Sequence, residues 1–148
     1  MHEKEIEYFS NGLKLANDEL IIDSIASFQS LINDFPKSEL ADDASYNISL
    51  LYYKINQFEK SIENLLKLID LYPEGKISTM DTSNEVGSIV EKAKYLLVQC
   101  YLAIDNVKKA EEIFDKMLND GETYLINNGE KKLYYDLTKD SIRIFKEM

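Results

Sequence analysis

Two stretches of this chain, IIDSIASFQSLINDFP at residues 21–36 and FEKSIENLLKLIDLYP at residues 58–73, superpose at a shift of 37 residues. Both copies keep a serine, an apolar residue at every third or fourth position, and a closing proline. Apolar residues at this spacing form one face of an α-helix, and a proline ends it. A repeat of this length is typical of a solenoid, in which stacked helix pairs present a surface for binding.

The pattern continues on the N-terminal side of each copy and predicts two complete helix pairs. Turn signals at Asn17-Asp18 and Asn56-Gln57 separate the two helices of each pair. The predicted repeats therefore cover about residues 4–37 and 38–73. Their helices are expected at about residues 3–16, 19–34, 39–54 and 58–71.

A third copy follows at a larger shift of 49 residues, which places Tyr95 where the second copy has Tyr46 and Cys100 where it has Leu51. The additional length, 49 minus 37 or 12 residues, falls in the polar stretch 74–85. We expect an inserted loop there, because loops tolerate added length at little entropic cost. The third repeat is then predicted at about residues 86–120.

The last part of the chain is predicted to close the solenoid. Residues 123–127 are interpreted as a loop or a further helical turn, and apolar residues recur at helical spacing from about residue 130 to 148. A helix there would cover the exposed end of the last repeat. The fold class predicted for residues 1–148 is a single all-α domain, a right-handed α-solenoid with three helix pairs and a capping helix.

Charge and composition narrow the classes of partner. The formal net charge is −10, which disfavours nucleic acid and anionic membrane surfaces and favours a basic partner. The longest apolar window, residues 95–104, is too short to span a bilayer. With one cysteine and no visible secretory signal, the sequence predicts a cytoplasmic protein. A periplasmic protein whose leader has been removed is the alternative.

The helix pairs resemble tetratricopeptide repeats, a family that places small residues where the two helices touch and closes each pair with a proline. The third copy lacks the proline and has Val98 at one of the small positions. Within the family, the segment 34–73 is most similar to bacterial repeat proteins that act as scaffolds in envelope assembly. The residues that carry the resemblance are Tyr8, Gly12, Ser24, Phe28 and Pro36 in the first copy, Ser49, Tyr52, Ser61, Leu65 and Pro73 in the second, and Tyr101, Ala110 and Phe114 in the third.

The resemblance implies a binding site on the concave face, which the first helix of each pair lines. It implies a non-enzymatic adaptor that binds a protein or peptide segment, basic or amphipathic, with Lys92 and Asp43 as polar edges. Three alternatives stay open: the C-terminal helix fills the groove, the face mediates homo-oligomers or stabilises a larger complex, or the residues are ordinary core. The expected lining residues are Phe9, Leu13, Tyr46, Leu50, Tyr53, Lys92, Tyr95, Gln99 and Leu102.

Reactive groups are few, and we expect no catalytic residue, metal or cofactor. Cys100 lies within an apolar run and is predicted to be a buried structural thiol. His2 is the chain's single histidine, so a histidine-based metal or acid–base site is not expected. Residues 81–85 carry alternating oxygen ligands, as calcium loops do, but have Val86 where the glycine is needed. A polar loop with a helix cap at Ser83 or Asn84 is the preferred interpretation.

Overall fold

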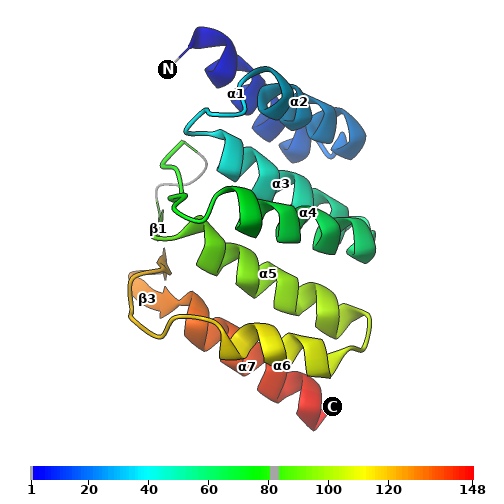
Figure 1. Cartoon of the computed structure of the whole chain (residues 1–148), viewed down its shortest axis with the longest axis vertical. Helices are drawn as coiled ribbons and strands as arrows, with labels where there is room; N and C mark the ends of the chain where they lie inside the picture. Colours follow the sequence, from blue (N-terminus) through cyan, green and yellow to red (C-terminus); the bar gives the residue numbers. More distant parts are fainter. Residues whose placement is uncertain (1, 81–83) are drawn as a thin grey trace.

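The computed structural model describes residues 2–80 and 84–148, which form seven helices and three short strands (Figure 1). The predicted all-α solenoid class is confirmed: the helices follow one another as antiparallel pairs that stack along the long axis of the molecule. The helices are α1 (Glu3–Asn17), α2 (Ile21–Asp34), α3 (Ala41–Lys54), α4 (Phe58–Leu71), α5 (Ile89–Ala103), α6 (Val107–Asp115) and α7 (Tyr134–Glu147). The strands are β1 (Glu85–Val86), β2 (Tyr124–Asn127) and β3 (Glu130–Leu133).

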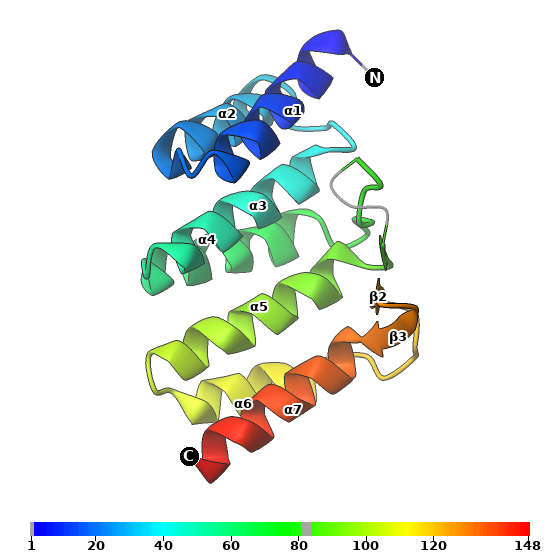
Figure 2. The same cartoon turned by 180° about the vertical axis from the view of Figure 1, so that it is seen from behind.

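The solenoid has two helical faces. The first helices of the pairs, α1, α3 and α5, lie in one row that α7 continues (Figure 2). The second helices, α2, α4 and α6, lie on the opposite side, which faces the viewer in Figure 1. Each second helix packs on the first helix of its own pair and on the next helix in the row. We call these surfaces the α1/α3/α5/α7 face and the α2/α4/α6 face.

The turn inside each pair has the same geometry three times. Glu19, Asn56 and Asp105 are the equivalent residues, with φ angles of 61°, 61° and 63°. In each turn the next N–H donates to a carbonyl five residues earlier, as Leu20 does to Leu15 at 2.9 Å. This is the Schellman arrangement that ends helices through one left-handed residue. The third pair is therefore a true copy of the first two, although it lacks their closing proline.

Small residues lie where the paired helices touch, as the sequence predicts. The Ser24 hydroxyl donates to the Gly12 carbonyl at 2.6 Å, and the Ser61 hydroxyl donates to the Ser49 carbonyl at 2.8 Å. A Cβ atom at position 12 would lie only 2.6 Å from the ring of Phe28. Helices α1 and α2 thus approach closely because Gly12 has no side chain.

The third pair is built differently at the same positions. Val98 replaces the small residue and is fully buried. Phe114, the counterpart of Leu65, is half-buried, and its ring centroid lies 4.8 Å from that of Tyr135 on α7. In this pair a larger residue on α5 thus accompanies a ring on α6 that packs against the core and also contacts the terminal helix.

The insertion is not only a loop. Its end forms β1, and Lys76 makes an isolated antiparallel bridge with Ser88. Ser88 caps α5, because its hydroxyl accepts hydrogen bonds from the backbone N–H groups of Val90 and Glu91. This corrects the predicted cap at Asn84. The predicted cap at Ser83 and the calcium-like positions Asp81 and Ser83 lie outside the described residues.

A three-stranded antiparallel sheet, in the order β1-β2-β3, was not predicted. Residues 124–127, interpreted as loop or helix, form β2, and residues 130–133, interpreted as the start of the last helix, form β3. Asn128 and Gly129 join the two strands with φ angles of 53° and 78°. Two such residues form the tight turn that the twist of a hairpin requires. Helix α7 therefore begins at Tyr134, four residues later than predicted.

Candidate binding face

Helix α7 extends the α1/α3/α5/α7 face and leaves it open. It packs on α5 and α6 and runs alongside α5 as the next member of the row (Figure 2). Helix α7 therefore lies beside the groove and does not fill it, which was one of the alternatives left open by the sequence. The surface between α3 and α7, over α5, is instead the part of the face where side chains from three helices meet.

An apolar groove lies at the C-terminal ends of these three helices, with a cavity of about 400 Å³. We call it the C-terminal groove. Its outer wall includes Ile144, whose side chain is 52% exposed although it is large and apolar. Three predicted lining residues come together here with residues of α7. The lining residues are Tyr53, Gln99, Leu102, Ala103, Ser141, Ile144, Phe145 and Met148.

Two side chains give the groove polar character. Tyr53 packs its ring against Phe58 at a centroid distance of 5.4 Å, and burial raises the pKa of its hydroxyl, which therefore stays protonated at neutral pH. Nε2 of Gln99 is buried and has no hydrogen-bond partner among the described residues. An unsatisfied buried donor costs about 1–3 kcal/mol, so a rotation of the Gln99 side chain that brought its amide to an acceptor in the groove would be favoured.

At the opposite end of the face, a buried polar cluster replaces the expected open lining. The Lys92 ammonium lies 3.1 Å from the Glu85 carboxylate, and the two side chains are only 6% and 13% exposed. The same ammonium lies 4.3 Å from the centre of the Tyr46 ring. The Tyr134 hydroxyl donates to the same carboxylate, at Oε1 of Glu85. The cluster thus joins β1, α3, α5 and α7.

These contacts change the roles expected for Tyr46, Lys92 and Tyr95. Burial, with the hydrogen bond to Glu85, raises the pKa of Tyr134, and burial raises that of Tyr95. The rings of Tyr95 and Tyr134 lie 5.3 Å apart. The three residues that were predicted to line an open groove therefore belong to contacts within the protein. Glu85 of β1 pairs with Lys92 there.

The predicted polar edge at Asp43 is also internal. Asp43 is fully buried, and its Oδ1 accepts a hydrogen bond from the backbone N–H of Ser78 at 2.9 Å. This bond ties the insertion to the first turn of α3. Gly75 permits the approach, because a Cβ atom there would overlap Oδ2 of Asp42 on α3.

The remaining lining residues lie apart from the groove. Phe9 is fully buried, and its ring meets that of Phe28 edge-on at 5.5 Å, so a partner on the surface would not touch it. Leu13 is half-buried in the α1–α3 core. Leu50 is half-buried against the core between α3 and α5.

Reactive groups do not converge on the face. Cys100 is fully buried, as predicted, and burial raises the pKa of its thiol, while a hydrogen bond with Ser61 at 3.3 Å opposes that shift. A neutral thiol is a poor nucleophile. Within residues 2–80 and 84–148, no three His, Cys, Asp or Glu side chains gather as they would around a metal ion. In the same ranges, no helix has the length and apolar character needed to cross a membrane.

The second helix pair carries the sequence signature of the fold. The family model for the tetratricopeptide repeat matches residues 42–74. The chain has the tetratricopeptide-repeat fold. Its likeness to solved tetratricopeptide structures covers nearly the whole chain, so the first and third pairs share the architecture of the matched one.

Two solved structures illustrate that likeness. The tetratricopeptide-repeat domain of Arabidopsis FLU aligns with 76% of this chain and 90% of its own, at 11% identity and a TM-score of 0.60. The nearly identical tetratricopeptide-like repeats of a putative kinesin light chain from Podosopora anserina align with 99% of this chain and 69% of their own, at 9% identity and a TM-score of 0.62. Identities this low establish the fold alone. A comparison with curated protein sequences gave no significant match.

The sequence did not lead us to predict that α7 contributes to the C-terminal groove or that Glu85 belongs to the polar cluster. A signal for the first was present: Ile142 and Ile144 are two residues apart and so lie on different sides of one helix. Ile142 is buried and Ile144 is exposed. A helix that only caps the core needs one apolar stripe, so a second stripe indicates another contact surface.

Proposed function

We propose that this tetratricopeptide-repeat domain is a non-enzymatic adaptor that docks a protein segment in the C-terminal groove. The observation that carries the proposal is the groove itself, in which Tyr53, Gln99 and Leu102 meet Ile144 and its neighbours on α7. An amphipathic helix or an extended segment would bury its apolar side chains there and bring backbone or side-chain acceptors to Gln99. Tetratricopeptide-repeat domains generally act as scaffolds for protein–protein interaction.

The expected segment is amphipathic with basic residues outside its apolar face. The chain's net charge of −10 would attract such a segment and speed its association at moderate ionic strength. Affinity would come from the apolar anchors, because rim charges contribute more to association rate than to binding strength. The cytoplasmic location predicted from the sequence stays a prediction.

Selection from a displayed library of amphipathic peptides tests the groove. We expect the wild-type chain to enrich peptides whose affinity falls roughly tenfold or more when Ile144→Glu is introduced, because a buried anchor contributes about 1–3 kcal/mol. Affinity is measured by fluorescence anisotropy with the selected peptides. Ile144 is 52% exposed, so the variant is expected to fold.

Ile22→Glu is the matched control, since Ile22 is an isoleucine on α2 that is 69% exposed and lies outside the groove. Peptides selected by the wild-type chain should bind this control unchanged. Equal loss in both variants, or no loss in Ile144→Glu with an unchanged helical spectrum, would remove the binding site from this groove.

A further inference from the structure

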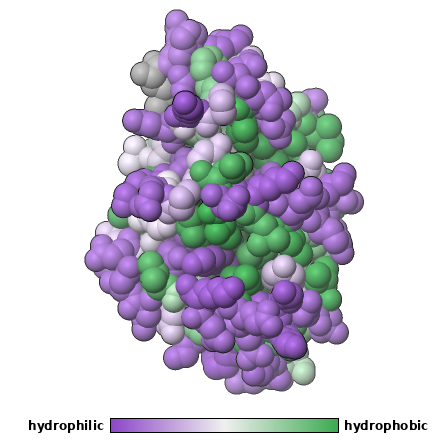
Figure 3. Space-filling model, viewed as in Figure 1, coloured by the Kyte–Doolittle hydropathy of each residue, from purple (hydrophilic) through white to green (hydrophobic). Residues whose placement is uncertain are grey.

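The α2/α4/α6 face carries an apolar surface that the adaptor proposal does not use. Helices α4 and α6 both pack on α5, which lies between them (Figure 1). We call the surface formed by these three helices the α4–α6 surface. Figure 3 shows apolar side chains spread across the middle of this face, over α4 and α5.

The apolar residues of the α4–α6 surface recur at helical spacing. On α4, Ile62, Leu66 and Ile69 follow the i, i+4, i+7 spacing and so form one stripe. Leu66 is 47% exposed, and the two isoleucines are half-buried. Tyr101 on α5 and Ile113 on α6 are also half-buried and pack against the same core.

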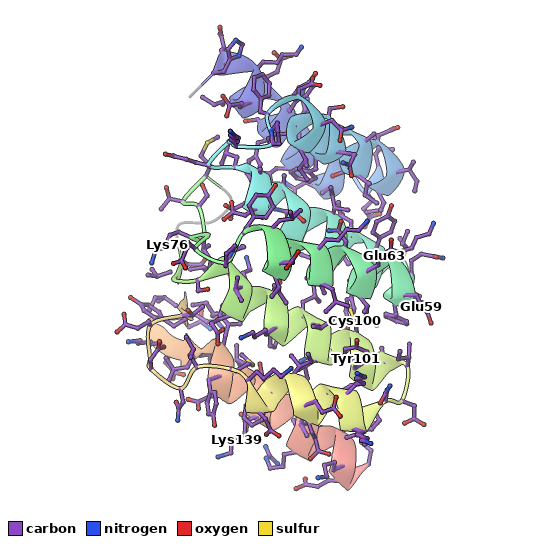
Figure 4. The ribbon with its side chains drawn as sticks, in the orientation of Figure 1. Glu59, Glu63, Lys76, Cys100, Tyr101 and Lys139 are labelled. Atoms are coloured by element: carbon purple, nitrogen blue, oxygen red, sulfur yellow. The ribbon has the colours of Figure 1, made fainter. Side chains whose placement is uncertain are left out.

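Charged side chains flank the apolar residues on either side, and we call these two rows the α4 wall and the α6 wall. On α4, Glu59 lies one turn before Ile62 and Asp70 lies one turn after Leu66, and neither carboxylate belongs to the buried core. Figure 4 shows Glu59 of α4 and Tyr101 of α5 toward the same end of the face. The α4 wall is therefore acidic on the side that carries Ile62 and Leu66.

The α6 wall is basic at the matching places. Lys109 and Lys116 are exposed and lie one turn before and one turn after Ile113. Lys109 is 3.6 Å from Glu112, but these side chains are 55% and 47% exposed, and such surface pairs contribute little. On α5, Lys94 pairs with Glu91 at 3.0 Å, so its charge is compensated.

We propose that the α4–α6 surface binds a second copy of this chain, with α4 of each protomer lying over α6 of the other. A two-fold axis that lies in the interface and runs along the helices makes this arrangement, because it places each acidic wall on a basic wall. An axis across the helices would place α4 on α4 and bring like charges together. The patch thus supplies both halves of an isologous interface.

The charge distribution favours a second copy over an unrelated partner. A partner of a single charge sign would be repelled by one wall, whereas this chain carries both signs in the required order. The net charge of −10 opposes association at long range, but salt screens it beyond about 8 Å at physiological ionic strength. This interface is separate from the C-terminal groove and does not depend on the adaptor proposal.

Light scattering coupled to size-exclusion chromatography tests the proposal across the micromolar range. We expect the mass of the wild-type chain to rise from monomer to dimer with concentration, and Leu66→Glu to weaken dimerisation roughly tenfold or more. Ile22→Glu, on the same face but outside the α4–α6 surface, should dimerise as the wild type does. A wild-type chain that stays monomeric throughout, or dimers that persist equally in Leu66→Glu, would overturn the proposal.

Charge exchange tests the arrangement within the dimer. The variant Glu59→Lys/Asp70→Lys has two basic walls, and Lys109→Glu/Lys116→Glu has two acidic walls. Neither variant should self-associate, but an equimolar mixture should form a heterodimer, detected by mass. Homodimers of either variant, or a mixture that stays monomeric while both chains keep the wild-type helical spectrum, would exclude α4 lying over α6.

Discussion

The Glu85→Ala chain is expected to lose about 3–5 kcal/mol of the free energy of unfolding, because removing one member of a buried ion pair leaves the other charge uncompensated. Lys92 would remain with its side chain 6% exposed, and the Tyr134 hydroxyl would lose its acceptor. Urea denaturation followed by circular dichroism measures the loss. A value below about 1 kcal/mol, as exposed pairs give, would mean that water reaches the Lys92 ammonium.

Two controls separate the buried charge from other effects. In Glu85→Met/Lys92→Met both charges are replaced by apolar side chains, and we expect most of the stability to return. The exposed pair of Lys132 and Glu130, at 3.6 Å, is the matched surface case. Glu130→Ala should change the free energy of unfolding by less than about 0.5 kcal/mol.

The ion pair gives the insertion a structural role. Within the stretch 74–85, the Ser78 N–H donates to Asp43 and, at its end, Glu85 pairs with Lys92. These contacts lie in the first turns of α3 and α5. The adaptor proposal therefore places the partner away from this buried cluster, in the C-terminal groove.

The helix pairs were predictable because one local pattern recurs. Each pair needs an apolar stripe, a small residue at the helix contact and a left-handed turn, and these occur within a few residues of one another in the chain. The turn residues Glu19, Asn56 and Asp105 show that the pattern holds even where the closing proline is missing. Local signals of this kind can be recognised in one sequence.

The sheet and the binding groove depend on contacts between distant segments. β1 pairs with β2 across 40 residues, in the register Glu85 with Leu125. The Asn128-Gly129 turn is a hairpin signal, but the apolar spacing that follows it resembles a helix and concealed β3. Lys92 was expected at an open edge because the segment that covers it, β1, belongs to an insertion that the regular repeats lack.

Phe28→Ala is expected to destabilise the chain by about 3–5 kcal/mol, because a fully buried ring is lost and the helices around it can close only part of the cavity. The ring contacts the backbone position of Gly12, which has no side chain to move into the space, and lies edge-on to the Phe9 ring. The measurement is the midpoint and slope of urea unfolding. An unchanged midpoint would contradict the packing between α1 and α2.

The second repeat supplies the matched exchange for this position. Shifted by 37 residues, Gly12 and Phe28 correspond to Ser49 and Leu65, which are both buried. Gly12→Ser alone should cost about 1–3 kcal/mol, because its Cβ meets the Phe28 ring. In Gly12→Ser/Phe28→Leu the smaller side chain removes that clash, and the double variant should be more stable than the sum of the single changes predicts. If the changes in the free energy of unfolding were strictly additive, the two positions would not be coupled. The pairing of Gly12 with Phe28 would then not determine the distance between α1 and α2.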